Sequence, residues 1–154
     1  MGTRYRGTNR EVIALDAYIK LMRAAESVTA RRAPLFAEAG LTVTQFGALE
    51  ALYHLGPMLP SELGRKLLKS SGNLTLVVDN LERRKLVRRE RSGDDRRRVT
   101  VHLTPGGRRL ISRIFPGHVK AIVEEMGTLN QSEQKTLGRL CRRLGLKQKG
   151  RRAS

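Results

Sequence analysis

Apolar residues recur three or four positions apart along most of the chain, which predicts a largely helical protein. The first such stretch begins near Asn9, where Thr8 and Glu11 have the spacing of a helix-capping box. Pro34 is expected to kink or restart this helix, and Gly40 to end it. Further helices are expected after Thr42, near Pro60, at Ser70 or Ser71, after Thr104 with a bend at Pro116, and from Asn130.

Between the fourth and fifth helices the apolar spacing becomes alternating, which predicts strands. LVRRER (86–91) and RRVTVHL (97–103) are interpreted as two strands joined by the turn-forming residues 92–95. Two short helices joined by a tight turn and followed by a hairpin are typical of a winged helix-turn-helix. In that arrangement the second helix enters the major groove and the hairpin is the wing. The expected fold class is mainly α with a small β-hairpin wing.

The first and last helices are amphipathic and have no obvious partner within the chain, so their apolar faces should pack against each other or against a second chain. We therefore expect four regions. Residues 1–38 form an N-terminal dimerisation helix with a basic arm, and residues 39–106 form the DNA-binding lobe. Residues 107–146 form C-terminal dimerisation helices, and residues 147–154 form a basic tail.

Net charge is the strongest compositional feature: 31 Lys and Arg against 14 Asp and Glu give +17 in 154 residues. Such a field attracts polyanions, with nucleic acid the first candidate and an anionic membrane the second. No nucleophile–base set, phosphate-binding glycine loop or metal-ligand spacing is recognisable, so neither an enzyme nor a cofactor is expected. No secretory signal or membrane span is evident, so the expected location is cytoplasmic.

The basic residues concentrate around the expected wing, where residues 83–98 hold nine Lys or Arg and three acids. Arg96 and Arg97 are the expected wing-tip contacts, because guanidinium groups suit phosphates and the minor groove. Asp95 is expected to orient one of them through an ion pair. The alternative is a solvated charge run with no partner. Sequence-independent phosphate contacts are expected from Lys66, Lys69, Arg84, Arg88 and Arg91.

The start of the expected recognition helix is rich in short hydrogen-bonding side chains: Ser70, Ser71, Asn73 and Thr75. Such groups suit phosphates and base edges, and a helix N-terminus itself favours a phosphate. Asn73 is the preferred base-reading candidate, by pairing with adenine. The alternative is that Ser70 or Ser71 only caps the helix, and the two roles are compatible.

Residues 41–107 resemble the DNA-binding core of MarR-type transcriptional regulators. The resemblance rests on VVDNLERRKLVRR and on a wing pattern of Asp95, Arg97, Leu103, Thr104 and Gly107. It implies a homodimer that binds a pseudopalindromic operator on double-stranded DNA, usually as a repressor. It also implies a small phenolic or anionic effector, in a cleft between the dimer helices and the DNA-binding lobe.

One residue departs from the family pattern, because Lys85 stands where the family commonly has glycine after the recognition helix. Either this turn differs, or left-handed strain of about 1 kcal/mol is tolerated in return for a phosphate contact.

Two further interpretations stay open at this point. Cys141 is interpreted as a buried small hydrophobe rather than a redox sensor. Tyr53 and His54 either line an effector cleft or are ordinary core or surface residues. The rival function is a non-specific architectural DNA-binding protein, which the charge and both basic ends would also suit.

Overall fold

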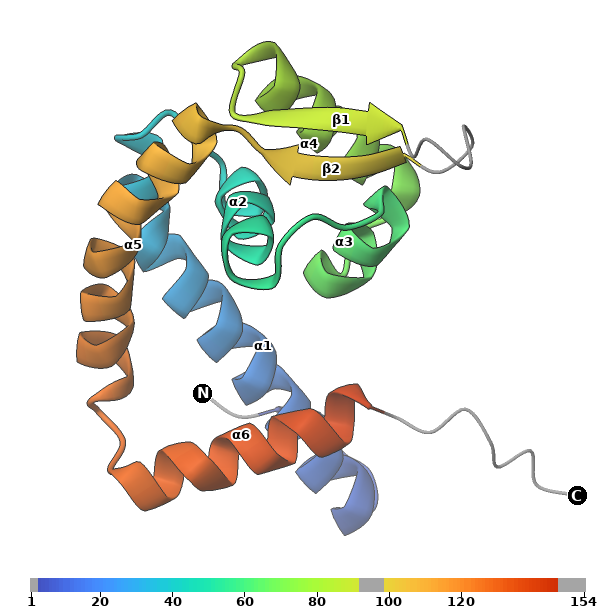
Figure 1. Cartoon of the computed structure of the whole chain (residues 1–154). Helices are drawn as coiled ribbons and strands as arrows, with labels where there is room; N and C mark the ends of the chain where they lie inside the picture. The colour runs from blue at the N-terminus through green and yellow to red at the C-terminus, as the bar shows by residue number, and fades with distance from the viewer. Residues whose placement is uncertain (1–2, 92–98, 147–154) are drawn as a thin grey trace, which may run out of the picture. The chain divides into compact units, whose positions relative to one another are not determined.

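The computed structural model describes residues 3–91 and 99–146 of the chain. It contains, in these ranges, α1 (Asn9–Ala37), α2 (Val43–Leu55), α3 (Pro60–Leu67), α4 (Ser71–Arg83), β1 (Val87–Arg91), β2 (Val99–Leu103), α5 (Pro105–Met126) and α6 (Gln131–Gly145). The expected fold class, mainly α with a β-hairpin, is confirmed (Figure 1). The chain forms two compact units that meet within α5, one ending at His118 and the other beginning at Val119.

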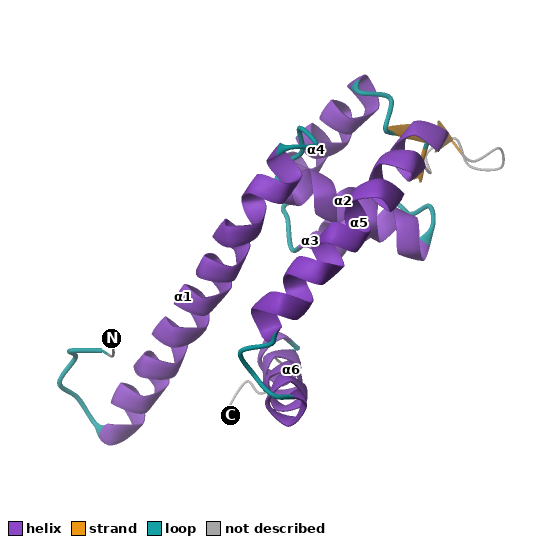
Figure 2. Cartoon of the chain, turned by 90° about the vertical axis from the view of Figure 1, so that its left-hand side faces the viewer, coloured by secondary structure: helices purple, strands orange, loops and turns teal. Residues whose placement is uncertain are grey.

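Helix starts follow from local capping chemistry. Capping boxes at Thr8–Glu11, Thr42–Gln45 and Asn130–Glu133 begin α1, α2 and α6, as predicted. In contrast, α1 runs through Pro34 as a continuous helix (Figure 2). Pro34 lies in the last turn of α1, so it costs few of the helix's hydrogen bonds and does not restart the element.

The core of the first unit is almost entirely aliphatic. It joins α2, α3, α4 and the hairpin to the end of α1 and the first half of α5. The fully buried large side chains are Phe36, Leu49, Leu52, Leu63, Leu74, Leu81, Ile111, Val78, Val87 and Val101. Phe36 and Phe46 stack with ring centroids 4.2 Å apart. No charged or polar residue is buried in this core, counting the residues the structure describes.

The two strands pair antiparallel in the predicted place. Val87 lies opposite Leu103 and Arg91 opposite Val99, and β1 contacts α4 while β2 contacts α2 and α3 (Figure 1). Met58, between α2 and α3, exchanges backbone hydrogen bonds with Val101 at 2.9 and 3.3 Å. The hairpin is therefore fixed to the helices at the middle of β2.

The turn between α4 and β1 is tightly constrained. Lys85 has φ 57°, so the turn is left-handed although the residue is not glycine. The Thr104 hydroxyl donates to the Lys85 carbonyl at 2.7 Å and accepts from the Gly107 N–H at 3.0 Å. A Cβ on Gly107 would lie 2.0 Å from the Leu86 carbonyl oxygen, so only glycine fits there. Because Lys85 itself adopts the left-handed conformation, the alternative that this turn differs from the family's is wrong.

The apolar stripes of the terminal helices are uncovered. Within the first unit, α1 exposes Ile13, Leu15, Tyr18 and Met22; within the second, Val119, Val123, Leu137, Leu140, Leu144 and Leu146 are exposed. Cys141 is also exposed, so the interpretation of it as a buried hydrophobe is wrong for the single chain. None of the helices described here combines the length and hydropathy needed to cross a membrane.

Candidate nucleic-acid interface

Helix α4 is anchored to the lobe by one face. Leu74, Val78 and Leu81 are buried, and they recur at the three- and four-residue spacing of a helix. The opposite face is left free to contact a ligand. The sharp turn before α4 passes through Leu68, which has φ 52° and is 91% exposed.

The first turn of α4 presents hydroxyl groups that the fold hardly uses. Ser70 stands at the N-cap, yet its hydroxyl makes no capping hydrogen bond within the described part of the chain. Thr75 donates to the Ser71 carbonyl at 3.0 Å. The hydroxyl of Ser70 is therefore available to a phosphate at the positive end of the helix dipole.

A groove of about 790 Å³ runs along the α3–α4 turn. It brings together predicted contacts Lys69, Ser70, Ser71 and Thr75. Ser61 and Arg65, which the sequence did not single out, lie in the same groove. No local sequence pattern marks these two residues, because they reach the groove only through the turn that brings α3 beside the start of α4. Four hydroxyls and two cations in one groove form an environment suited to a phosphate backbone.

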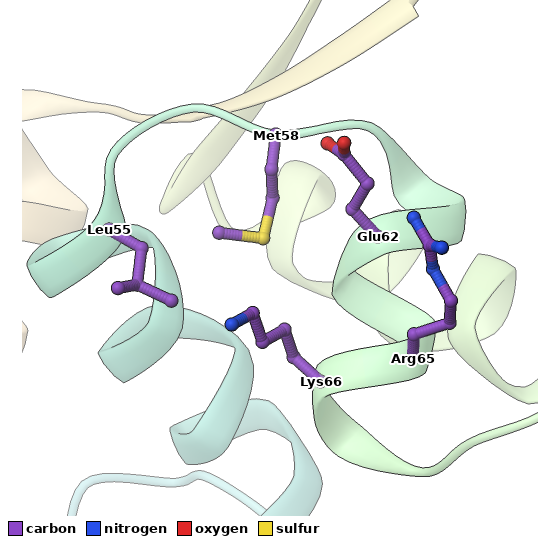
Figure 3. A pocket seen from close by; sticks show the side chains of 5 residues that line it. All are labelled: Leu55, Met58, Glu62, Arg65 and Lys66. Atoms are coloured by element: carbon purple, nitrogen blue, oxygen red, sulfur yellow. The ribbon is translucent and has the colours of Figure 1, made fainter.

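Lys66 is placed differently from Lys69. It lies on the side of α3 that faces α2, where it lines a pocket of about 380 Å³ with Leu55, Met58, Glu62 and Arg65. Figure 3 shows the Lys66 side chain extending toward Leu55 and Met58. The Glu62 carboxylate accepts from the Leu59 N–H at 2.9 Å and so serves to cap α3.

Two arginines of the charge run belong to the scaffold. Arg84, a predicted phosphate contact, donates to the carbonyl oxygens of Gly40 at 2.5 Å and Ala39 at 3.2 Å. Arg89 contacts Asp79 and Glu82 of α4, each at 2.5 Å, and clamps β1 to that helix. Burial lowers the pKa of Arg89, but hydrogen bonds to Asp79 and Glu82 outweigh it, and the net shift is upward.

Of the remaining candidate wing contacts, two lie within the described residues and three lie outside them. Arg88 and Arg91 are exposed on β1, and Arg88 forms an ion pair with Glu90. Asp95, Arg96 and Arg97 lie outside the described residues. The strands on either side of them, β1 and β2, are paired as far as Arg91 and Val99.

A second cavity, of about 460 Å³, lies among α1, α2, α3 and His118 of α5 within the first unit. Arg32, Glu50, Lys66, Lys69 and His118 contribute its charged or titratable groups. Arg32 Nε and His118 Nδ1 are shielded from solvent and have no hydrogen-bond partner among the residues described. Burial lowers the pKa of His118; Glu50 opposes this and Arg32 adds to it.

Tyr53 and His54 do not line this cavity. The Tyr53 ring carries the Arg108 guanidinium 5.4 Å from its centroid, and His54 packs on Phe115 with centroids 4.7 Å apart. Both side chains therefore belong to packing between α2 and α5, which supports the alternative of ordinary structural residues.

A short helix, a tight turn, a second helix with one exposed face and an anchored basic hairpin define a winged helix-turn-helix DNA-binding protein. Comparison with known proteins identifies the family. Residues 39–98 match the model of the MarR family. HTH-type transcriptional regulator MhqR of Bacillus subtilis is 35% identical over 136 residues, which cover 88% of this chain and 94% of that protein. The chain belongs to the MarR family of DNA-binding transcriptional regulators.

Solved structures agree with this assignment. Sco3205 of Streptomyces coelicolor, a MarR family regulator in complex with DNA, is 25% identical, with a TM-score of 0.82 and coverage of 96% of this chain and 95% of its own. BpsR of Bordetella bronchiseptica, whose DNA binding is regulated by 6-hydroxynicotinic acid, is 27% identical, with a TM-score of 0.76 and coverage of 84% and 98%.

Proposed function

We propose that this protein is a repressor that binds a pseudopalindromic operator as a homodimer and is released by a small aromatic anion. The observation that carries the proposal is the groove at the α3–α4 turn, where four hydroxyls and two cations meet at the start of a helix with one exposed face. In this proposal Asn73 reads a base, and Lys69, Ser70, Ser71 and Thr75 contact phosphates or base edges.

Other contacts fall into two groups. Arg88, Arg91, Arg96 and Arg97 would supply wing contacts, with Asp95 orienting one of the last two, and Lys66 would add a phosphate contact. Arg84 contributes indirectly, because its guanidinium already bonds two backbone carbonyls at the end of α1. Its role would be to hold the recognition helix in place rather than to bind a phosphate.

The homodimer is supported by the uncovered apolar faces of the terminal helices. Burial of such stripes against a second chain removes apolar surface from water, at about 25 cal/mol per Å². A twofold dimer presents two recognition helices and therefore favours an inverted repeat in the DNA. The regions 1–38 and 107–146 are the proposed dimerisation elements.

The proposed effector site is the cavity that contains Arg32 and His118. Its two unpartnered nitrogens and its lysines suit a small acid, and its phenylalanine rings suit an aromatic one. Lys69 lines both this cavity and the DNA-side groove. An anion in the cavity would therefore draw a cation away from the phosphate, which couples effector binding to loss of DNA.

The test is selection of bound duplexes from a random pool, near physiological salt, where screening acts over about 8 Å. An inverted repeat with half-sites about one helical turn apart is expected. Recovery without any motif, with binding that collapses steeply as salt rises, would contradict the proposal and favour the architectural protein instead.

The effector part is tested with the recovered operator and salicylate as the probe. Salicylate should weaken operator binding by the wild-type protein, while Arg32→Met should bind the operator normally and lose the response. Arg23→Met, on the same helix but outside this cavity, is the matched control. An unchanged salicylate response in Arg32→Met would reject the cavity as the effector site.

A further inference from the structure

The exposed face of α4 has an apolar centre. Leu76 is 61% exposed, and it lies two residues after buried Leu74, so it projects about 200° around the helix from the core face. Single exposed leucines are common on protein surfaces and need no explanation by themselves. The position of this one matters, because it occupies the middle of the face that a winged helix-turn-helix turns toward the major groove.

Neighbouring polar groups on the C-terminal half of this face are already engaged. Asp79 pairs with Arg89, and the Asn80 side chain accepts from Arg83. A hydrogen-bonding readout of bases is therefore concentrated at the first turn. At the level of Leu76 the helix offers the groove an apolar side chain instead.

Gly72, one turn before Leu76, has no role in the fold that requires glycine. A Cβ added there would meet nothing within 4 Å, counting the described residues, and its φ is not positive. Gly72 is the second residue of α4, so it lies in the first turn and not in the helix interior. Packing within the described part of the chain therefore does not require the missing side chain, which leaves room for another molecule to approach this face closely.

The major groove offers one apolar group on its base edges, the 5-methyl group of thymine. We propose that Leu76 selects thymine in each half-site by packing on that methyl group, and that Gly72 lets the helix come close enough for the contact. This inference rests on the proposed sequence-specific function and adds Leu76 as a residue that determines specificity.

The test uses the full-length protein and the operator recovered by selection, with each thymine of a half-site replaced in turn by deoxyuridine. That replacement removes the methyl group and keeps the base pairing. For the wild-type protein, one position in each half-site should weaken binding about fourfold when substituted, the value expected for one buried carbon.

Leu76→Ala should bind the unmodified operator more weakly and show no further loss at that position. Leu55→Ala is the matched control, because Leu55 is 58% exposed on a different helix, and it should keep the full methyl effect. Gly72→Ala should not lower the Tm, because the added methyl group meets nothing within 4 Å among the described residues, and yet it should weaken operator binding about tenfold, the size of one base contact.

The outcomes distinguish a failure of the proposed sequence-specific function from a failure of the role of Leu76. Absence of any selected motif would overturn both the proposed function and this inference. A clear motif without a methyl-sensitive thymine, or a methyl effect that persists in Leu76→Ala, would overturn the role of Leu76 alone. A Gly72→Ala protein that binds the operator normally would overturn the close approach.

Discussion

The DNA-binding lobe and the terminal helices differ in how much of their apolar surface is buried within one chain. In the lobe, apolar residues from helices and strands far apart in sequence bury one another, and even the hairpin is tied in through Met58. The first half of α1 and all of α6 carry equally regular apolar stripes that remain exposed. Regular spacing therefore identifies a face that must be buried, and it leaves open whether the partner is in the same chain.

The largest expected contrast is between Leu49 and Leu140. Leu49 is 0% exposed and Leu140 is 48% exposed in the single chain. Leu49→Ala should lower the free energy of unfolding by about 2–5 kcal/mol, because it leaves a cavity in the lobe. Leu140→Ala should cost less than about 0.5 kcal/mol in a dilute sample.

Urea unfolding of both variants at several chain concentrations measures this contrast. If α6 belongs to a dimer interface, the deficit of Leu140→Ala relative to the wild type should grow as concentration rises, because association stabilises the wild type more. A small deficit that stays constant over the whole concentration range would show that the α6 stripe is not buried by a second copy.

A smaller contrast is available inside the lobe, at two adjacent glycines. Gly107→Ala should destabilise the protein by about 1–3 kcal/mol, since the new methyl group would overlap the Leu86 carbonyl. Gly106→Ala has its nearest contact at 3.6 Å and should be neutral or stabilising by up to about 1 kcal/mol. Thermal melts of the pair would show whether the α5 start is as tightly packed as its geometry implies.

The smallest predicted effect concerns Lys85. Lys85→Gly should stabilise the lobe by about 0.5 kcal/mol, because relief of left-handed strain exceeds the added entropy of the unfolded chain. Lys85→Ala removes the same charge and keeps Cβ, so it should give no such gain. Equal stabilisation by both variants would attribute the effect to charge. Weaker operator binding in both would support the phosphate contact of Lys85.

Local chemistry made most of the fold predictable. The capping boxes, the Gly40 turn and the helix starts depend on residues a few positions apart, and they appear where the sequence places them. The strands depend on equally local alternation: β1 begins one residue later than predicted, and residues 97–98 of the second predicted strand lie outside the described residues. The exception, continuity through Pro34, arises because the proline falls in the last turn, and periodicity alone does not fix where that turn is.

The candidate site was less predictable because charge runs do not show what each member faces. Arg84, Arg88 and Arg89 look alike in sequence, yet one holds two backbone carbonyls, one pairs with a neighbouring glutamate, and one clamps a strand to a helix. Ser61 and Arg65 join the groove only through the fold of the turn. Leu76 fits neither the core pattern nor the polar pattern of the site, since a lone leucine carries no signal until its exposure is known.

The bonds from Arg84 to Ala39 and Gly40 connect the first residue after α4 with the turn that follows α1, 45 and 44 residues earlier in the chain. The Arg84 side chain is thus a link of fixed length between the end of α4 and the end of α1. A displacement of the end of α1 is transmitted to the C-terminal end of α4 for as long as both hydrogen bonds hold. The orientation of α4 relative to the end of α1 is then held by two hydrogen bonds of one side chain, and Arg84 determines how stiffly the two ends move together.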